Sequence, residues 1–463
     1  MFYPAELEKI VGWLNEIQGE IVDHRLSSKA HNAVSSPVAN TLILRDANGR
    51  AQVANPAAAQ DIASKSYVDS KAPTFIYNCT GNDDDLAIQG IVNNFFISGS
   101  AQSMKLIING TLGLRSSLPP GYSDHIRIFT SNTRGVECFL DFTNCTIPLI
   151  SLETSFLGFV GITDPVTNIS ITGLVLKGVH QGVNFYGAHN IRFLNCSIST
   201  SSSAVLFGSD GSDTHHIRFI NCKLESLGTQ VIAGPSNPAG CYHSFDNCII
   251  AGGSSSSLGL GDCTFSNCTL PPTSLLGSEN KFSNCVFTGT LSFNSGSRKN
   301  SFNNCKIMSG NNGVVFNANC IGNNLTNCII IGGNDGITCY SGSSNAIVNC
   351  TISGTVNGVC LKSGVTGKIA FLGCTIISAG VGVYVQTQST AAIVELIGSA
   401  VKGDTQDVQQ TTLASTVKWH IVGNLFSKAT IVVDGTTAIS YKTASANIYF
   451  PQYANFFNCQ IDV

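Results

Sequence analysis

Charged side chains are scarce in this sequence. Only 11% of its 463 residues are Asp, Glu, Lys or Arg, less than half of the share near 25% that is usual for globular domains. The net charge is −3 and Lys and Arg do not cluster, which argues against a nucleic-acid partner. Since 43% of the residues are apolar, a disordered chain is not expected. Ser, Thr and Asn fill most polar positions, and such a surface suits uncharged, hydrogen-bonding ligands such as sugars.

Three further signals are missing. No run of 18 apolar residues free of charges and turn residues occurs, so no membrane insertion is expected. The first residues, MFYPAELEKIVGWLNE, lack a basic segment followed by an unbroken apolar one, so no signal peptide is expected. Histidine or paired cysteine at metal-ligand spacing is absent as well, so the sequence predicts neither a metal site nor a cofactor.

Cysteine, in contrast, is abundant and regularly placed. In a chain of this length without an export signal, the 18 cysteines are expected to be reduced thiols folded in a bacterial cytoplasm. From Cys196 to Cys374 a cysteine recurs every 17 to 26 residues, and a period in this range is typical of a solenoid. The repeated pairs are Asn144-Cys145, Asn195-Cys196, Asn221-Cys222, Asn247-Cys248, Asn267-Cys268, Asn284-Cys285, Asn304-Cys305, Asn327-Cys328 and Asn349-Cys350, with Gly373-Cys374 closing the series.

Each repeat alternates apolar and polar residues, as in NIRFLNCSIS, which indicates short strands joined by tight turns. A unit of about 22 residues without a helix leaves room only for a strand-turn-strand coil, so residues 141–400 are predicted to form a parallel β-helix with coils about 4.8 Å apart. The asparagine is expected to adopt left-handed geometry at a bend and to stack on the asparagine of the next coil. The cysteine is expected to face the core as a small hydrophobic residue.

Both ends of a solenoid need caps. Residues 82–97, NDDDLAIQGIVNNFFI, combine initial aspartates with apolar residues at helical spacing. They predict a capping helix at about 84–97 within a β-helix entry region at 75–140. After Val401 the repeat fades, so residues 401–463 are predicted to form a C-terminal β region that caps the solenoid and helps to trimerise it.

Two segments precede the predicted solenoid. Residues 1–30 are predicted to be helical, because apolar residues follow the 3- and 4-residue steps of a heptad seam. This helix either joins a short coiled coil of three or four chains or packs on its own chain. The seam residues are Leu7, Ile10, Leu14, Ile17 and Ile21. Residues 31–74 are predicted to contain a strand, a DANG turn, a second strand and a helix start near Asp61.

The string LRDANGRAQVANP, followed by SKSYVDS, resembles a segment common near the N-termini of bacteriophage tail fibre and tailspike proteins. The string GNDDDLAIQGIVNN resembles the start of the pectate-lyase-like right-handed β-helix of many tailspikes, although the usual upstream glycines are missing. The resemblance implies a homotrimer in the virion tail. Residues 31–74 would then serve as a virion adaptor that docks on a phage tail or baseplate protein, with the β-helix facing host surface polysaccharide.

Candidate site residues gather around FGSDGSDTHHIRF. Asp210 and Asp213 lie there and Glu225 follows on the next unit, and two carboxyl groups roughly 5–9.5 Å apart are what glycoside hydrolysis requires. The same string is also an ordinary turn sequence. We expect Glu225 to approach Arg218 or an aspartate across one coil, and we expect His215 and His216 to point to opposite faces of a strand. The candidates for glycan binding through hydrogen bonds and aromatic stacking are His215, Arg218, Tyr186, Tyr242 and Tyr340.

Three functions fit these observations. The first is attachment to the host cell surface through glycan binding. The second is depolymerisation of surface polysaccharide by a hydrolase or lyase on the same β-helix, with Asp210, Asp213 and Glu225 as the catalytic candidates. The third is a structural spacer that carries another receptor-binding protein.

Overall fold

A computed structural model of the chain divides into two units, Met1–Thr74 and Phe75–Val463. It describes residues 74–97, 103–115, 124–129, 137–147, 155–160, 166–207, 214–233, 242–340, 344–386 and 392–410, with short gaps at 229, 253–255, 259, 276 and 363–364. Short strands between 418 and 461 complete the described part. The predictions for residues 1–30 and for nearly all of 31–74 lie outside the described residues.

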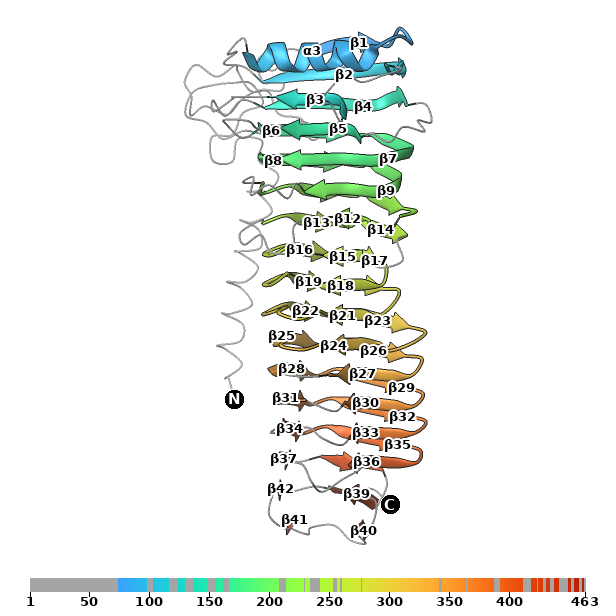
Figure 1. Cartoon of the computed structure of the whole chain (residues 1–463), viewed down its shortest axis with the longest axis vertical. Coiled ribbons are helices and arrows are strands. Elements are labelled where there is room, and N and C mark those ends of the chain that lie inside the picture. The colour runs from blue at the N-terminus through green and yellow to red at the C-terminus, as the bar shows by residue number, and fades with distance from the viewer. Residues whose placement is uncertain are drawn as a thin grey trace, which may run out of the picture. The chain divides into compact units, whose positions relative to one another are not determined.

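The second unit is a parallel β-helix, as the sequence predicts. Its coils stack along three sheets (Figure 1). Sheet 1 has 17 strands, which are β1 (Thr74–Asn78), β2 (Met104–Thr111), β4 (Cys138–Thr146), β6 (Val166–Thr172), β8 (Ala188–Leu194), β10 (Arg218–Ile220), β13 (Ser244–Asp246), β16 (Thr264–Ser266), β19 (Lys281–Ser283), β22 (Ser301–Asn303), β25 (Ile321–Thr326), β28 (Ser344–Val348), β31 (Gly367–Leu372), β34 (Ala392–Ile397), β37 (Lys418–Val422), β41 (Tyr449–Phe450) and β42 (Ala454–Phe457).

Sheets 2 and 3 complete each coil. Sheet 2 has 16 strands, which are β3 (Asp124–Phe129), β5 (Ser155–Val160), β7 (Val175–Tyr186), β9 (Ser197–Phe207), β11 (Lys223–Ser226), β12 (Ile232–Ala233), β14 (Ile249–Gly252), β17 (Thr269–Leu270), β20 (Val286–Phe287), β23 (Lys306–Ser309), β26 (Ile329–Gly332), β29 (Thr351–Gly354), β32 (Thr375–Ser378), β35 (Ala400–Gly403), β38 (Leu425–Phe426) and β43 (Gln460–Ile461). Sheet 3 has 10 strands, which are β15 (Ser256–Leu258), β18 (Thr273–Leu275), β21 (Leu291–Phe293), β24 (Val314–Phe316), β27 (Asp335–Cys339), β30 (Asn357–Leu361), β33 (Val381–Val385), β36 (Gln406–Gln410), β39 (Thr430–Val433) and β40 (Thr437–Ser440).

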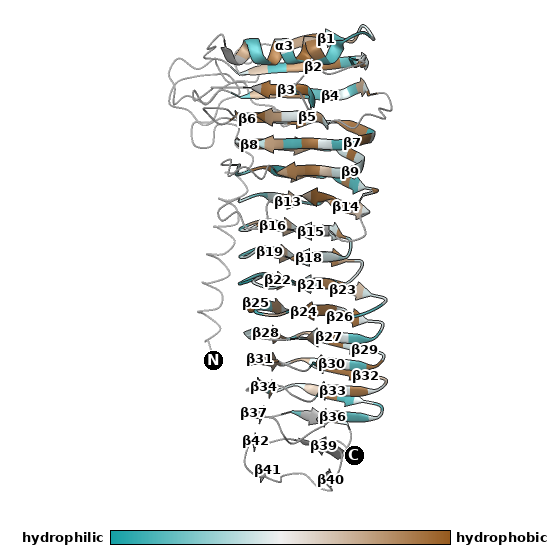
Figure 2. Ribbon diagram, viewed as in Figure 1, coloured by the Kyte–Doolittle hydropathy of each residue, from teal (hydrophilic) through white to brown (hydrophobic). Residues whose placement is uncertain are grey.

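The coils stack in register, so equivalent side chains form columns. Hydrophobic and hydrophilic residues alternate along strands such as β7, β8 and β9 (Figure 2), because successive residues of a strand face opposite sides of its sheet. One buried column consists of phenylalanine rings from sheet 1, whose centroids lie 4.5–5.2 Å apart in nearly parallel planes. Its members are Phe193, Phe219, Phe245, Phe265, Phe282 and Phe302.

The Asn-Cys pairs form the bend between sheets 1 and 2. Asn195 to Asn349 of the repeated pairs have φ between 51° and 55°, the left-handed conformation that asparagine tolerates better than most residues. Several of their amides stack as predicted: Asn221 Nδ2 donates to Asn195 Oδ1 (3.2 Å), and Asn247 Nδ2 donates to Asn221 Oδ1 (2.8 Å). The cysteines that follow face the core.

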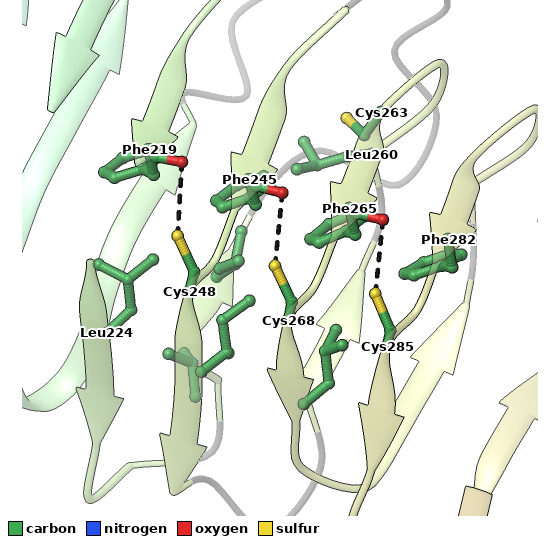
Figure 3. Close-up of a cluster of buried hydrophobic side chains, with 14 of the residues drawn as sticks. Phe219, Leu224, Phe245, Cys248, Leu260, Cys263, Phe265, Cys268, Phe282 and Cys285 are labelled. Carbon is green, nitrogen blue, oxygen red and sulfur yellow. Dashed lines mark hydrogen bonds between the residues drawn. The ribbon is translucent and has the colours of Figure 1, made fainter. Parts of the chain in front are cut away.

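The thiols of these cysteines also form hydrogen bonds between coils. Cys248, Cys268 and Cys285 each donate a hydrogen bond to the carbonyl of a phenylalanine on the preceding coil at 3.4 Å (Figure 3). Ser399 Oγ takes over this role farther along and donates to Phe371 O. Burial raises the pKa of the Cys374 thiol to about 11, so this thiol stays neutral at physiological pH. The hydrogen bonds between coils give the buried cysteines a structural role.

A second polar column is fully enclosed. Asn280, Asn300, Asn323 and Asn345 are all buried. The side-chain oxygens of Asn300, Asn323 and Asn345 each accept a hydrogen bond from the backbone amide of the preceding asparagine of the column, at 3.0 Å. Such a ladder satisfies buried polar groups that would otherwise be costly.

Helix α3 (Asp84–Ile97) lies across the N-terminal end of the stack (Figure 1), in the range where the sequence predicts a capping helix. Ile88 and Val92 belong to the hydrophobic core. Asp84 accepts hydrogen bonds from the Gly113 amide (2.7 Å) and the Tyr77 hydroxyl (2.7 Å). The next residue, Asp85, forms an ion pair with Arg115, whose Nε lies 2.9 Å from Asp85 Oδ2. The aspartates thus tie the helix to the first coil, and no cluster of three metal-ligating side chains occurs in the described residues.

The parallel stack extends beyond both boundaries that the sequence suggests, 141 and 400. On the N-terminal side β2 pairs in parallel with β4, and β3 with β5. On the C-terminal side parallel pairing continues from β34 through β37 to β42, and the antiparallel pair β39–β40 lies between β37 and β42 in the sequence. The cysteine repeat ends near Val401 in the sequence because Ser399 and Asn424 take the place of cysteine at the bend.

Candidate glycan-binding site

A polar hollow lies on the outer face of sheet 1. Its volume is about 210 Å³. The lining residues come from four successive coils, those of β4, β6, β8 and β10, which together span about 14 Å at the strand spacing of a sheet. They are Glu137, Asn168, Ser170, Asn190, Ile191, Arg192, His216 and Arg218.

The strands supply one column of the hollow. Ser170, Arg192 and Arg218 are direct neighbours in register on β6, β8 and β10. The adjacent residues Phe193 and Phe219 are buried, so strand alternation turns the two arginines outward, and both are exposed.

Residues with left-handed backbone geometry supply a second column. Asn168, Asn190 and His216 each lie two residues before a member of the first column and have φ of 58°, 54° and 58°. Tyr242 continues this column on the next coil with φ 48°. The Tyr242 ring is 55% exposed and stacks on His216 with centroids 5.4 Å apart. An aromatic face therefore lies beside the hollow, one coil beyond His216.

The two arginines carry uncompensated charge. In the described part of the chain neither guanidinium forms an ion pair with a carboxylate, Glu137 included, whereas lysines elsewhere in the solenoid do. Lys105 pairs with Asp141 (3.5 Å), Lys299 with Glu279 (2.9 Å) and Lys368 with Glu395 (2.9 Å). Like charges directly opposite each other on neighbouring strands are destabilising. The hollow is therefore positively charged at a local cost in stability.

The expectation that His215 and His216 point to opposite faces is wrong. Their Nδ1 atoms lie 2.6 Å apart, so one nitrogen donates a hydrogen bond to the other. The left-handed backbone of His216 interrupts the strand alternation on which the expectation rests. His215 also stacks on His189 of the preceding coil, with ring centroids 3.5 Å apart. The three rings thus form one cluster at the edge of the hollow.

Two histidines near the hollow have lowered pKa values. Desolvation lowers the pKa of His216 below its usual value of 6.5, and His215 and Arg218 lower it further. His216 is therefore mostly neutral at neutral pH. Burial lowers the pKa of His243 to about 3. The His243 Nδ1 atom accepts a hydrogen bond from the Ile217 amide at 3.2 Å, and its ring stacks on Phe207.

The structure separates Glu225, one of the three predicted catalytic residues, from the hollow. Glu225 lies on β11 of sheet 2 and pairs with Lys223 at 2.9 Å. Arg218 lies on β10 of sheet 1, on the other side of the Asn221 bend, so the expected approach of Glu225 to Arg218 is not observed. Asp210 and Asp213 lie outside the described residues.

The predicted binding residues are divided among the faces. His215, Arg218 and Tyr242 lie in or beside the hollow. Tyr186 is half-buried at the end of β7 in sheet 2, and Tyr340 is 42% exposed directly after β27 in sheet 3. One glycan segment in the hollow would not contact these two faces as well.

Sequence reasoning missed six of the lining residues, namely Glu137, Asn168, Ser170, Asn190, Ile191 and Arg192. The arginine pair had a detectable signal. The strings IRFLNC and IRFINC place Arg192 and Arg218 at the same position of successive repeats, and equivalent positions of a β-helix stack in register. No such repeat of residue type marked Glu137.

Comparisons with known proteins agree with the fold. A family model described as a right handed beta helix region matches residues 240–396, which lie beyond the hollow. No curated protein sequence matches the chain. Among solved structures, tailspike protein 3 of bacteriophage CBA120 is similar with a TM-score of 0.49 and 12% identity over 80% of this chain. The chain spans 62% of the length of that tailspike chain.

Two bacterial enzymes are similar at the same level. One is the A-module of the Azotobacter vinelandii mannuronan C-5 epimerase AlgE4, with a TM-score of 0.47 and 13% identity, covering 74% of this chain and 100% of that one. The other is a mannuronic acid specific polysaccharide family 6 lyase from human gut microbiota, with a TM-score of 0.46 and 12% identity, covering 71% and 86%. None of the described helices is long and apolar enough to cross a membrane.

Proposed function

We propose that this protein attaches a bacteriophage to its host as a tail fibre or tailspike protein that binds surface glycan in the hollow on sheet 1. The polar groups of the hollow are the main support for this proposal. It presents amide, hydroxyl and guanidinium groups over four coils, which are the convergent polar groups that fix a polar ligand. Tyr242 beside it adds an exposed aromatic face, which can pack against the apolar side of a sugar ring.

The phage role is supported by the resemblance of LRDANGRAQVANP and SKSYVDS to tail fibre and tailspike N-termini. On this proposal residues 31–74 bind a phage tail or baseplate protein, and the protein is located in the virion tail. The β-helix then faces the host polysaccharide.

The proposal includes a homotrimer. Besides the heptad seam in residues 1–30, sheet 2 exposes an apolar face. Ile329, Ile331 and Ile377 are 46%, 41% and 40% exposed, and Met308 lies in register beside Ile331. We name these four residues the isoleucine face. Met308, Ile329 and Ile331 are neighbours on adjacent strands, and Ile377 lies two strands beyond Ile331, with Ser353 between them. Exposed apolar residues grouped on one face are typical of interaction surfaces, and a second copy of the chain held alongside by the predicted N-terminal helix would cover them.

Binding is favoured over cleavage. Glycoside hydrolysis uses two carboxyl groups, and Glu137 is the single carboxylate among the described residues that line the hollow. A hydrolase would therefore need a further carboxylate from outside that set, such as Asp210 or Asp213. Purified protein that shortens the polysaccharide of cells to which it binds, with loss of this activity in Asp210→Asn, would establish the enzyme instead.

The test is to block the hollow without altering its charge. Ser170→Trp places a large ring in the hollow, and Thr264→Trp is the matched control, because Thr264 occupies the same outward column of sheet 1 beyond Arg218 and Ser244. Purified protein is incubated with susceptible bacteria and bound protein is measured. We expect Ser170→Trp to abolish binding and Thr264→Trp to retain it. Equal binding by both variants would overturn the proposal, and no binding by the wild type would favour a spacer.

A further inference from the structure

We infer that the hollow recognises an anionic sugar unit, a uronate or a phosphorylated residue, whose oxyanion lies between Arg192 and Arg218. This inference rests on the proposed glycan-binding function and names its ligand class. It differs from what the overall composition suggests, since a chain with only 11% charged residues is expected to prefer neutral sugars.

The geometry favours an oxyanion. Arg192 and Arg218 are register neighbours on adjacent parallel strands, so their Cα atoms are separated by about one strand spacing, 4.8 Å. Each guanidinium presents a planar fork of N–H donors that matches a carboxylate or a phosphate. Two such forks side by side can hold one oxyanion from two directions. Ser170 and Asn190 lie beside them and can bind the neighbouring hydroxyl groups of the same sugar.

The charges of the two arginines also favour an anionic ligand. Two cations stacked without a carboxylate partner repel each other, and an anion bound between them converts this repulsion into attraction. Some other cations of the solenoid are compensated within the chain, as in Lys299–Glu279 and Lys368–Glu395. Among the described residues Arg192 and Arg218 have no carboxylate partner, so a ligand can supply the compensating charge.

His216 adds a pH dependence to this site. It lines the hollow beside Arg218. The groups that face it are His215, Arg218, His243 and the Tyr242 ring, with Glu137 as the acidic group of the lining. The pKa of His216 lies below its usual value of 6.5, so the ring gains a proton only below that pH. A third cation then faces the anion, so binding of an anionic sugar strengthens once the pH falls below the pKa of His216.

The experiment measures binding of the full chain to a panel of purified neutral and acidic bacterial capsular polysaccharides. Each acidic polymer is also tested after its carboxyl groups are reduced to alcohols, and each phosphorylated one after dephosphorylation, which distinguishes the two sources of oxyanion. The variants are Arg192→Gln, Arg218→Gln and the control Lys281→Gln. Lys281 is an exposed cation of the same outward column, two coils beyond Ser244, so its removal changes net charge but not the hollow. Thermal unfolding midpoints confirm that each variant is folded.

We expect the bound polymers to be acidic, with affinity falling roughly tenfold or more in each arginine variant and on removal of the anionic group. The Lys281→Gln variant should bind like the wild type. Binding to a neutral polymer that both arginine variants retain would overturn the inference while leaving glycan binding intact. An equal loss in Lys281→Gln would show general charge attraction and also overturn it. Failure to bind any polymer or any cell would instead contradict the proposed function itself.

Discussion

At the scale of single residues, the bend between sheets 1 and 2 selects for left-handed backbone geometry. Asparagine occupies it in most coils, and Gly373 and Gly398 occupy it in later ones with φ of 63° and 58°. The alternation between these two residue types shows that conformation, more than the amide ladder, is the common requirement. Most other residues with a Cβ atom are strained there.

A pair of substitutions at Asn284 separates the two contributions. Asn284 is exposed, has φ of 54°, and donates to Asn267 Oδ1 at 3.3 Å. We expect Asn284→Gly to change the free energy of unfolding little and Asn284→Ala to lower it by about 1 kcal/mol, because alanine disfavours left-handed geometry. Urea unfolding curves measure the difference. Equal destabilisation by both would show that the amide ladder dominates.

His243 makes stability depend on pH. Its pKa of about 3 in the folded protein lies below the usual 6.5, so the unfolded chain takes up a proton first as the pH falls. Stability is therefore complete above pH 6.5 and declines by about 1.4 kcal/mol per pH unit below it, until the pH approaches the folded value. In His243→Phe, which keeps an aromatic ring against Phe207, this decline should disappear between pH 6.5 and 5. If the free energy of unfolding falls by the same amount in wild type and variant between pH 6.5 and 5, the assignment is wrong.

At the scale of elements, short strands are stabilised by columns that cross many coils. Strands such as β19 and β22 are only three residues long, so each depends on its neighbours above and below. The enclosed asparagine ladder links these neighbours through side-chain oxygen to backbone amide hydrogen bonds.

Removal of one member of this ladder should be costly. Asn300→Ala leaves the buried amide of Asn280 without its acceptor, and we expect a loss of about 3 kcal/mol, since a buried group loses its partner and a cavity forms. Asn324→Ala is the matched control, because Asn324 is exposed on β25. Chemical denaturation of both variants compares them. A similar small effect in both would show that the ladder contributes little.

The sequence predicted these elements well where a residue type repeats. The Asn-Cys pairs revealed the bend, the inward cysteines and the parallel β-helix. They could not reveal the hollow, which depends on register between coils of unequal length and on a left-handed residue, His216, that reverses the expected direction of a side chain. The coils after Cys374 escaped notice because Ser399 and Asn424 replace the cysteine at the bend. On the N-terminal side the coil of β2 escaped notice because Gly110 lies in register with Cys145.

At the scale of the whole molecule, the proposed trimer is held by two surfaces, the predicted heptad seam in residues 1–30 and the isoleucine face. We expect the full chain to sediment at about three times its monomer mass of 48.7 kDa. Ile329→Asp together with Ile331→Asp should weaken the trimer, because each charge would be buried against a neighbouring copy. Analytical ultracentrifugation measures this, with Thr264→Asp, at an exposed residue of sheet 1 outside the isoleucine face, as the comparison. A monomer in the wild type would contradict the proposal.

Removal of residues 1–74 tests the adaptor at the same scale. Since the second unit contains its own hydrophobic core and its capping helix, we expect the truncated protein to bind cells but to be absent from purified virions. Incorporation of the truncated protein into virions would contradict the adaptor assignment.

The central claim is that a host glycan binds in the hollow on sheet 1. The most direct test is a crystal structure of the full chain with an oligosaccharide prepared from a polysaccharide to which it binds. We predict sugar density in the hollow, with an oxyanion contacting Arg192 and Arg218 and a sugar ring near Tyr242. Density confined to the outer faces of sheets 2 and 3, with the hollow empty, would contradict the account.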